Sequence, residues 1–198
     1  NNGTVVVLGG TGTASTSYAH AIVATASSGY TFSSWASSST STTITSTTTA
    51  STTVKVGAAA TLTATSAVGT SNKVTLTLKK DGSASTALDG YTVNISTSSS
   101  TNSATWSGTT TTSSTLAISG AMTPGTTYYV WVGKDANHKS DLVYSGVSFT
   151  GAAAATATIN FYTITGALSN STMTLNGTSL ANNGTVVVLG GTGTASTS

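Results

Sequence analysis

The chain contains no cysteine, no arginine and no glutamate, and it has a single proline. The absence of cysteine excludes a disulfide framework and thiolate metal sites. Charged residues make up 5% of the 198 residues, against roughly 25% in an average soluble domain. The formal net charge of +2 is too small for nucleic-acid binding, which needs clustered Lys and Arg. Serine and threonine are far more frequent than usual, so we expect a polar but nearly uncharged surface.

Long hydrophobic runs are also missing. No apolar run approaches the roughly 18–20 residues that a membrane-spanning helix needs, so no membrane span is expected. The 37% of hydrophobic residues suffices for one or two small cores. Low charge and abundant Ser and Thr are associated with extracellular proteins, and we expect this chain outside the cell or at the cell surface.

One segment occurs twice. Residues 1–17, NNGTVVVLGGTGTASTS, recur letter for letter as residues 182–198. A match of this length does not arise by chance, and it predicts a tandem array with a period of 181 residues. Arrays of near-identical units are typical of extended, quasi-one-dimensional proteins. Because the period exceeds the roughly 20–50 residues of solenoid repeats, each unit should hold whole domains.

A second interpretation of the recurrence is head-to-tail assembly, in which the shared strand belongs to a neighbouring subunit. In either case the expected partners are copies of the chain itself, with glycans or the cell surface as further partners. The strand expected to join the copies consists of Val5, Val6, Val7 and Leu8, or equivalently Val186, Val187, Val188 and Leu189.

Apolar residues alternate with polar ones along much of the chain, which is typical of half-buried β-strands. In KVTLTLKK, Val74, Leu76 and Leu78 point one way and the threonines point the other. The same pattern predicts strands at 73–80, 91–95, 116–118, 128–132, 143–149 and 157–164. Asp81-Gly82 and Pro124-Gly125 predict turns. Residues 18–26 fit a strand or a helix equally well, and the fold class is predicted to be all-β.

Changes in composition near residues 53–60 and 151–155 predict the domain boundaries. Residues 57–158 have the length and strand spacing of a small Ig-like or prealbumin-like β-sandwich. The remainder is expected to form a second small β-rich domain that is split across the repeat boundary. Residues 1–56 would be its C-terminal part, and residues 159–198 would be the N-terminal part of the next copy.

Two segments resemble known families of bacterial and archaeal surface proteins with tandem repeats. The stretch SGYTFSSW, Ser28–Trp35, resembles the Gly-Tyr-x-Phe-x-x-Trp signature of internalin-type B repeats. The middle segment, with Lys79, Lys80, Asp81 and Gly82 ending its first strand, resembles prealbumin-like, collagen-adhesin B-type modules. Both resemblances imply stalks that hold other domains away from a cell wall.

The second resemblance also implies a covalent crosslink. Collagen-adhesin modules often carry an amide bond between a Lys and an Asn, and the matching residues here are Lys80 and Asn160. The assisting Glu of those modules is absent from this chain. In the simpler interpretation, Lys80 flanks the turn with its ammonium group in water.

The glycine-rich stretch TVVVLGGTGTAS, Thr4–Ser15, resembles the start of a nucleotide-binding Rossmann unit. Such a unit needs a helix after the glycines and an acidic residue about 20 positions further on. No Asp or Glu precedes Asp81, and Ser15 stands at the third glycine position. A turn between two strands explains Gly9, Gly10 and Gly12 more simply, so a nucleotide-dependent enzyme is the remote alternative.

No recognisable catalytic set is present, and we predict no enzymatic activity and no cofactor. The chain has two histidines, His20 and His138. Asp135, Asn137, His138 and Asp141 lie close together in the sequence. Hard cations favour the oxygen ligands that Asp and Asn supply, but these residues match no calcium-loop spacing. No metal site is therefore predicted.

Aromatic side chains leave one functional alternative open. Trp35, Trp106, Tyr128, Tyr129 and Trp131 either fill cores or form platforms that stack on sugar rings. A carbohydrate-binding surface adhesin would need Trp106 or Trp131 to be exposed and coplanar. The main function that we expect is structural. The chain would be a subunit or repeat of an extracellular filament, stalk or sheath, assembled head to tail through β-strands, with adhesion as an additional role.

Overall fold

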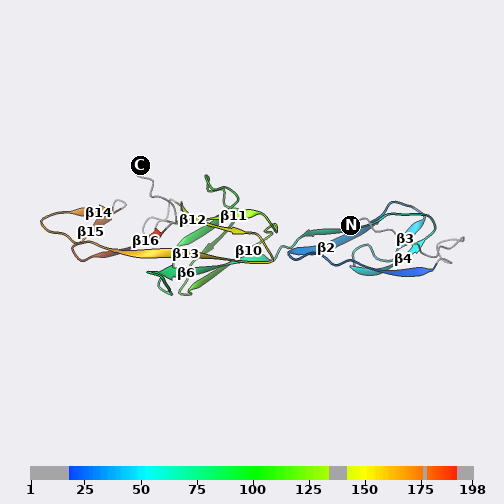
Figure 1. The fold of residues 1–198 in the computed structure, drawn as a ribbon, viewed down its shortest axis with the longest axis horizontal. Coiled ribbons are helices and arrows are strands. Elements are labelled where there is room, and N and C mark those ends of the chain that lie inside the picture. The colour runs from blue at the N-terminus through cyan, green and yellow to red at the C-terminus, as the bar shows by residue number, and fades with distance from the viewer. Residues whose placement is uncertain (1–17, 134–141, 176–177, 191–198) are drawn as a thin grey trace. The chain divides into compact units, whose positions relative to one another are not determined.

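The computed structural model describes residues 18–133, 142–175 and 178–190. All of the regular structure in these ranges is β-strand, which confirms the predicted all-β class (Figure 1). The contacts within the chain divide it into two compact units, residues 1–69 and residues 70–198. Each unit is described here by itself.

Unit 1 holds a three-stranded antiparallel sheet and a separate strand pair. The sheet has the order β1-β4-β3 and consists of β1 (Ala19–Val23), β4 (Ser51–Val56) and β3 (Thr42–Ile44). The pair consists of β2 (Tyr30–Ser37) and β5 (Leu62–Val68), which run antiparallel. The alternation in residues 19–23, which fitted a helix as well, forms a strand because its residues pair with β4.

The core of unit 1 is small. Among the described residues of this unit, the buried hydrophobic side chains are those of Trp35 and Val54. The Trp35 Nε1 group donates a hydrogen bond of 3.0 Å to the carbonyl oxygen of Thr49. Its ring packs against Phe32 with the ring centres 5.6 Å apart. The SGYTFSSW segment therefore supplies the main hydrophobic anchor of this unit.

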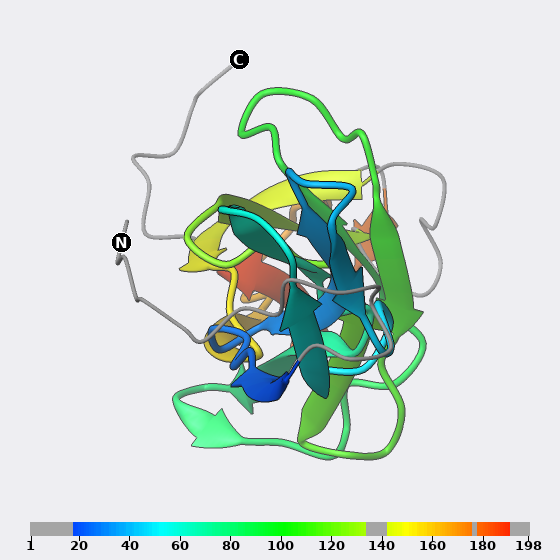
Figure 2. The same ribbon diagram turned by 90° about the vertical axis from the view of Figure 1, so that its right-hand side faces the viewer.

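Unit 2 contains two larger sheets and a short strand pair (Figures 1 and 2). The first sheet has the order β10-β6-β13-β16, and β7 (Ser83–Ala84) also pairs with β6. Its other strands are β6 (Asn72–Lys80), β10 (Thr115–Gly120), β13 (Ala154–Thr165) and β16 (Thr185–Gly190). The second sheet has the order β12-β11-β8-β9, with β8 (Thr92–Ser96), β9 (Trp106–Thr109), β11 (Thr127–Gly133) and β12 (Leu142–Thr150). Strands β14 (Met173–Leu175) and β15 (Thr178–Leu180) form the pair.

The two large sheets of unit 2 share one core, as in a β-sandwich. The predicted alternation of β6 is confirmed, because Val74, Leu76 and Leu78 are fully buried. The other members of the fully buried set from both sheets are Val93, Ile95, Val130, Val132, Ile159 and Phe161. Each such side chain contributes about 1.5–3 kcal/mol through its removal from water.

Both predicted turns are present, and their backbone angles explain their residues. Asp81 and Gly82, between β6 and β7, both have positive φ angles, of 50° and 83°. A two-residue hairpin turn of this kind favours Asp-Gly. Gly125, which follows the single proline, has a φ of 84°, the conformation that a turn with Pro and Gly at its centre requires.

The structure divides the chain at places different from those expected. The first division lies between Gly69 and Thr70, not before residue 57, because β5 pairs with β2 of unit 1. The alanine-rich stretch after Val56 is a connection inside unit 1, where the Gly57 amide bonds to the Ser41 carbonyl oxygen at 2.8 Å. Strand β13 runs without a break through the other expected boundary, between residues 158 and 159.

Residues after 158 consequently belong to the sandwich. Ile159 and Phe161 are fully buried in its core, and β16 pairs with β13. The start of the second domain at residue 159 is therefore not supported, and the joining of later residues to residues 1–56 of the next copy stays a prediction.

This packing predicts a strong contrast between two neighbouring strands. Leu76→Ala removes a fully buried side chain and should lower the free energy of unfolding of unit 2 by about 2–5 kcal/mol. Thr156→Ala, at an exposed position on the paired strand β13, should cost less than about 1 kcal/mol. Urea unfolding followed by tryptophan fluorescence measures both. Equal effects of the two substitutions would contradict the assigned core.

Candidate functional site: the place of strand β16 on β13

The residues expected to join successive copies form strand β16 at the end of the described chain. Val186 to Leu189 lie within β16, which pairs antiparallel with residues 160–165 of β13. We call this edge of β13 the β16 site. The equivalent residues Val5 to Leu8 lie outside the described part of the chain.

Strand β13 is long enough to serve two partners. Its residues 154–161 pair in parallel with β6, and its residues 160–165 pair with β16 on the opposite edge. The N-terminal half of β13 is therefore integrated into the sandwich, while its C-terminal half carries β16. Each backbone hydrogen bond in such a ladder contributes about 1 kcal/mol net to stability. The hydrogen bonds of the six residue pairs between β13 and β16 add together.

The side chains of β16 alternate between the core and the outer face. Val187 and Leu189 are partly buried and pack against the core of the sandwich. Val186 and Val188 point to the other face, where they lie opposite Ile164 and Tyr162. All four apolar side chains of β16 are half-buried, so a slip by one residue would exchange Val187 and Leu189 for other apolar residues. The register therefore depends on the turn that precedes the strand and on Gly190 more than on apolar alternation.

The residues that lead into β16 form a tight turn against the end of β13. The side-chain oxygen of Asn182 accepts a hydrogen bond of 2.8 Å from the Leu168 amide. Asn183 has a φ of 58°, a conformation that asparagine tolerates better than most residues. The amide of Gly166 bonds to the carbonyl oxygen of Gly184 at 2.9 Å. The Asn-Asn-Gly sequence therefore orients the chain for pairing.

A glycine ends the strand for a steric reason. A Cβ atom added to Gly190 would overlap the ring of Tyr162, which lies over this position. Gly190 pairs with Asn160. Asn182, Asn183, Val187, Leu189 and Gly190 therefore each have an identifiable role at this site.

The carboxylate of Asp81 bonds to the opposite edge of β13, at a residue that also pairs with β16. The Asp81 side chain accepts two hydrogen bonds from Thr163, one from its amide and one from its hydroxyl group, both of 2.7 Å. The Asp81 amide donates to the Phe161 carbonyl oxygen at 3.0 Å. Asp81 thus extends the pairing of β13 beyond the last residue of β6. The hydroxyl and amide hydrogen bonds from Thr163 lower the pKa of Asp81 below its usual value of 3.8, with a smaller contribution from Lys80.

The structure does not bring Lys80 and Asn160 together. Asn160 pairs with Lys79, whereas Lys80 pairs with Phe161. Neighbouring residues of a strand point to opposite faces, so Lys80 and Asn160 lie on opposite sides of the sheet. An amide bond between them would need a different register, and this geometry does not support the crosslink.

Trp106 and Trp131 do not form the exposed, coplanar platform that the carbohydrate-binding alternative needs. Trp131 is buried, with 8% of its surface exposed, and its Nε1 group donates to the Ser98 carbonyl oxygen at 3.3 Å. Its ring is tilted by 48° against that of Tyr144. Trp106 meets Tyr128 edge to face and lies over Gly120, where an added Cβ atom would overlap the indole. Trp35 and Tyr128 are buried core residues.

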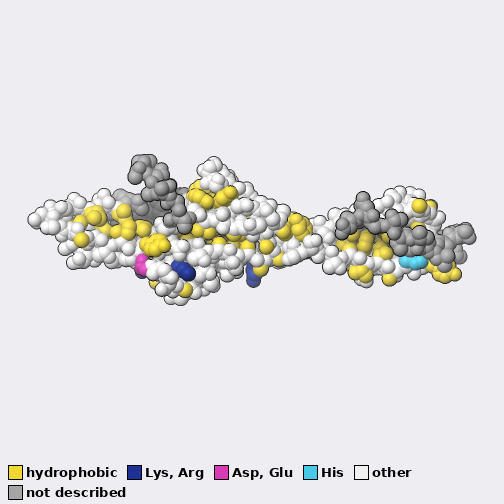
Figure 3. All heavy atoms as spheres, in the orientation of Figure 1, with side chains coloured by type: hydrophobic (Ala, Val, Ile, Leu, Met, Phe, Trp, Pro, Cys, Tyr) yellow, Lys and Arg dark blue, Asp and Glu magenta, His cyan; other side chains and the backbone are white. Residues whose placement is uncertain are grey.

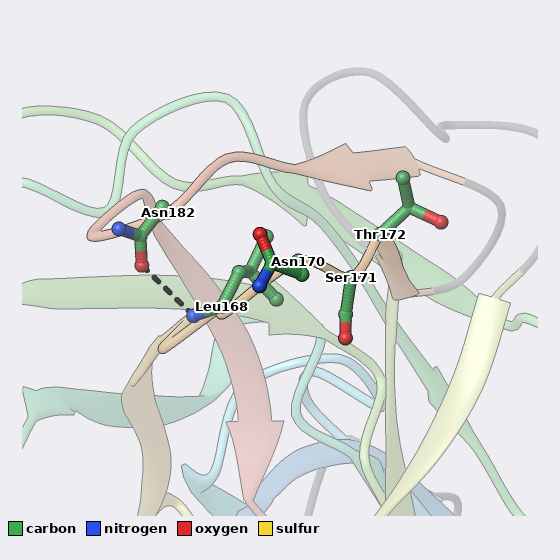
Figure 4. A pocket seen from close by; sticks show the side chains of 5 residues that line it. All are labelled: Leu168, Asn170, Ser171, Thr172 and Asn182. Atoms are coloured by element: carbon green, nitrogen blue, oxygen red, sulfur yellow. Dashed lines mark hydrogen bonds between the residues drawn. The ribbon is translucent and has the colours of Figure 1, made fainter.

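Two open hollows in the described chain contain no group suited to acid–base catalysis. One, of about 710 Å³, is lined by Leu168, Asn170, Ser171, Thr172 and Asn182 (Figure 4). Its polar groups are amides and hydroxyls, and the Asn182 oxygen is already bonded to the Leu168 amide. The other, of about 270 Å³, lies beside Trp35 and is otherwise lined by Ala, Ile, Ser and Thr.

Neither a metal site nor a membrane-spanning helix is found in the parts that the structure describes. Those parts contain no group of three metal-ligating His, Cys, Asp or Glu residues and no helix fit to cross a bilayer. Asp135, Asn137, His138 and Asp141 lie outside the described ranges, as does Thr4–Ser15. Thr185–Gly190 repeats the sequence of Thr4–Gly9. It forms an antiparallel edge strand, whereas the Rossmann unit is built on parallel strands.

Comparison with known proteins adds no family to this description. No protein-family model matches the chain, and no curated protein matches it. The segments that resemble internalin-type repeats and collagen-adhesin modules lie in β2 and at the β6–β7 turn. The function is therefore argued from the repeat and from the β16 site.

The Asp81–Thr163 contact predicts a specific acid sensitivity. A carboxylate whose pKa is lowered in the folded state stabilises the protein above its usual pKa, and that stabilisation is lost as the pH falls through the folded-state pKa. The unfolding temperature of unit 2 should therefore fall below pH 3.8, and Asp81→Asn should reduce this dependence. Thermal unfolding as a function of pH measures the effect.

Asp89→Asn is the matched control, since it removes the same charge from another exposed loop position. It should leave the pH dependence as in the unmodified chain. The same acid sensitivity in the Asp81→Asn chain as in the unmodified chain would show that the contact does not matter.

Proposed function

We propose that the chain is a structural repeat of an extracellular filament, stalk or sheath. It consists of one 181-residue period followed by the first 17 residues of the next. The observation that carries the proposal is the recurrence of those residues together with the position of their second copy. Thr185–Gly190 is an integral strand of the sandwich and not a loose tail.

Successive copies share this strand in the proposed array. Strand β16 closes the sandwich of one copy, and the same nine-residue stretch, NNGTVVVLG, opens the following copy. Unit 1 of that copy begins its first described strand at Ala19, ten residues after Gly9. The backbone ladder of β13 and β16 thus lies at every junction, where tension along the array would act.

The surface composition supports close association of many copies. On the face drawn in Figure 3, charged side chains are few and lie apart among uncharged polar atoms. The whole chain has six Lys or Arg and four Asp or Glu. Such a surface provides little electrostatic repulsion between copies. It also provides no clustered charge for nucleic acid.

The resemblances to surface-protein modules point in the same direction. Both families imply spacing of domains away from a cell, and an extracellular location is part of the proposal. A carbohydrate-binding function receives no support from the buried Trp131 or from the edge-to-face contact of Trp106. Adhesion remains an additional role that no described surface of the chain explains.

A two-period chain tests the array directly. Residues 1–181 followed by residues 1–198 should form one extended particle, about twice as long as the single chain, because repeats contact only their neighbours. Small-angle X-ray scattering and sedimentation measure its length. The length should change little between about 0.1 and 1 M salt, where the screening length falls from about 10 to about 3 Å.

The single 198-residue chain is the reference for this measurement. A two-period chain that packs into one compact body, with a maximum dimension close to that of the single chain, would rule out the array.

A further inference from the structure

Each copy has one β16 site and two segments that fit it. The site requires an Asn-Asn-Gly turn, apolar side chains at the positions of Val187 and Leu189, and a glycine at position 190. Residues 1–9 have the same sequence as residues 182–190, so they meet each requirement at the matching position. In particular, Val6 corresponds to Val187, and Leu8 corresponds to Leu189.

The site of a given copy cannot hold both segments. In this structure it is occupied by residues 185–190, which pair with residues 160–165. Residues 1–17 lie outside the described part of the chain, and the inference about them rests on their sequence. Residues 4–9 can use this site only on another copy, where they take the place of that copy's own residues 185–190.

We propose that residues 4–9 of one copy pair with residues 160–165 of β13 on another copy, in the register of β16. The other copy is a separate chain, because in a continuous array residues 182–190 of one copy would be the same residues as 1–9 of the next. This inference rests on the proposed function, because it names the surface through which copies join. Addition of a strand to a sheet edge is a common mode of recognition in which the backbone provides affinity and alternate side chains provide specificity.

The geometry of this contact leads to open-ended assembly. The donated strand and the accepting edge are different surfaces of the same chain, so each copy donates to one neighbour and accepts from another. Such a heterologous contact forms filaments unless it closes into a ring. The contact is apolar and backbone-mediated, since neither β16 nor residues 160–165 contain a charged side chain.

Disulfide trapping between two full-length chains tests the proposed register. The chain has no native cysteine, so only introduced cysteines can react. Ile164 and Val186 are paired residues, and Val5 corresponds to Val186. Paired antiparallel residues have Cα atoms about 4.5–5.5 Å apart, within the range that a disulfide needs.

The acceptor chain carries Ile164→Cys together with Val187→Asp and Leu189→Asp, which disfavour its own β16 in the site. It also carries Val6→Asp and Leu8→Asp, so that it cannot donate. The donor chain carries Val5→Cys alone and is used in large excess. The two chains are refolded together from urea, because an acceptor that cannot close on its own strand can then close on the donor's strand.

The expected result is a disulfide-linked heterodimer of one donor and one acceptor on a non-reducing gel. A donor with Val6→Cys in place of Val5→Cys should lose this product, because neighbouring residues point to opposite faces. A donor with Val5→Cys and Leu8→Asp should also lose it. A donor with Val5→Cys and Val7→Thr should keep it, because Val7 corresponds to the outward-facing Val188.

The absence of the heterodimer, or equal yields with Val5→Cys and Val6→Cys, would overturn the proposal. In another unfavourable outcome, the acceptor keeps its own aspartate-bearing strand in the β16 site despite an excess of the apolar donor. That result would also overturn the proposal. An acceptor that also carries Val186→Cys reports this outcome as an internal disulfide.

The two-period chain separates this inference from the proposed function. If it remains extended while the heterodimer fails to form, the array stands and the β16 site does not accept a strand from a separate chain. If the heterodimer forms while the two-period chain is compact, the site is correct and the extended array is wrong.

Discussion

Pairing along both edges of β13 is the interaction on which unit 2 depends. The N-terminal part of this strand bonds to β6 in parallel, and the C-terminal part bonds to β16 in antiparallel orientation. Ile159 and Phe161 anchor it in the core. Where the parallel ladder with β6 ends, Asp81 continues the pairing of β13 through its hydrogen bonds with Thr163. Displacement of β13 would therefore disrupt the core and the site for β16 at the same time.

The same arrangement relates stability to assembly. Strand β16 packs two partly buried side chains against the core of the sandwich, so the segment proposed to lie between copies is also part of each copy's fold. Strand β16 lies at the edge of its sheet, and an unpaired strand edge is a template for aggregation. In the proposed array this tendency is used, since each such strand pairs with one defined neighbour. The nearly uncharged surface does not oppose that contact.

The sequence predicted the elements of unit 2 better than their grouping. Alternation identified β6 and the central part of β13, and Asp81-Gly82 identified a turn, because these features depend on neighbouring residues alone. The boundary between Gly69 and Thr70 could not be found in this way. A change to alanine-rich sequence is compatible with a linker, and it is equally compatible with a connection inside unit 1. Pairing of β5 with β2 decided between the two.

The sequence by itself determined the all-β class and the segment that occurs twice, because composition, periodicity and identity are properties of the letters. Only the tertiary structure decided what that segment contacts. The register of β13 set Asn160 beside Lys79 and not Lys80, and packing of the second sheet buried Trp131. The Asp81–Thr163 contact joins residues 82 positions apart. Such contacts depend on which strands become neighbours, and alternation along one strand carries no information about its partner.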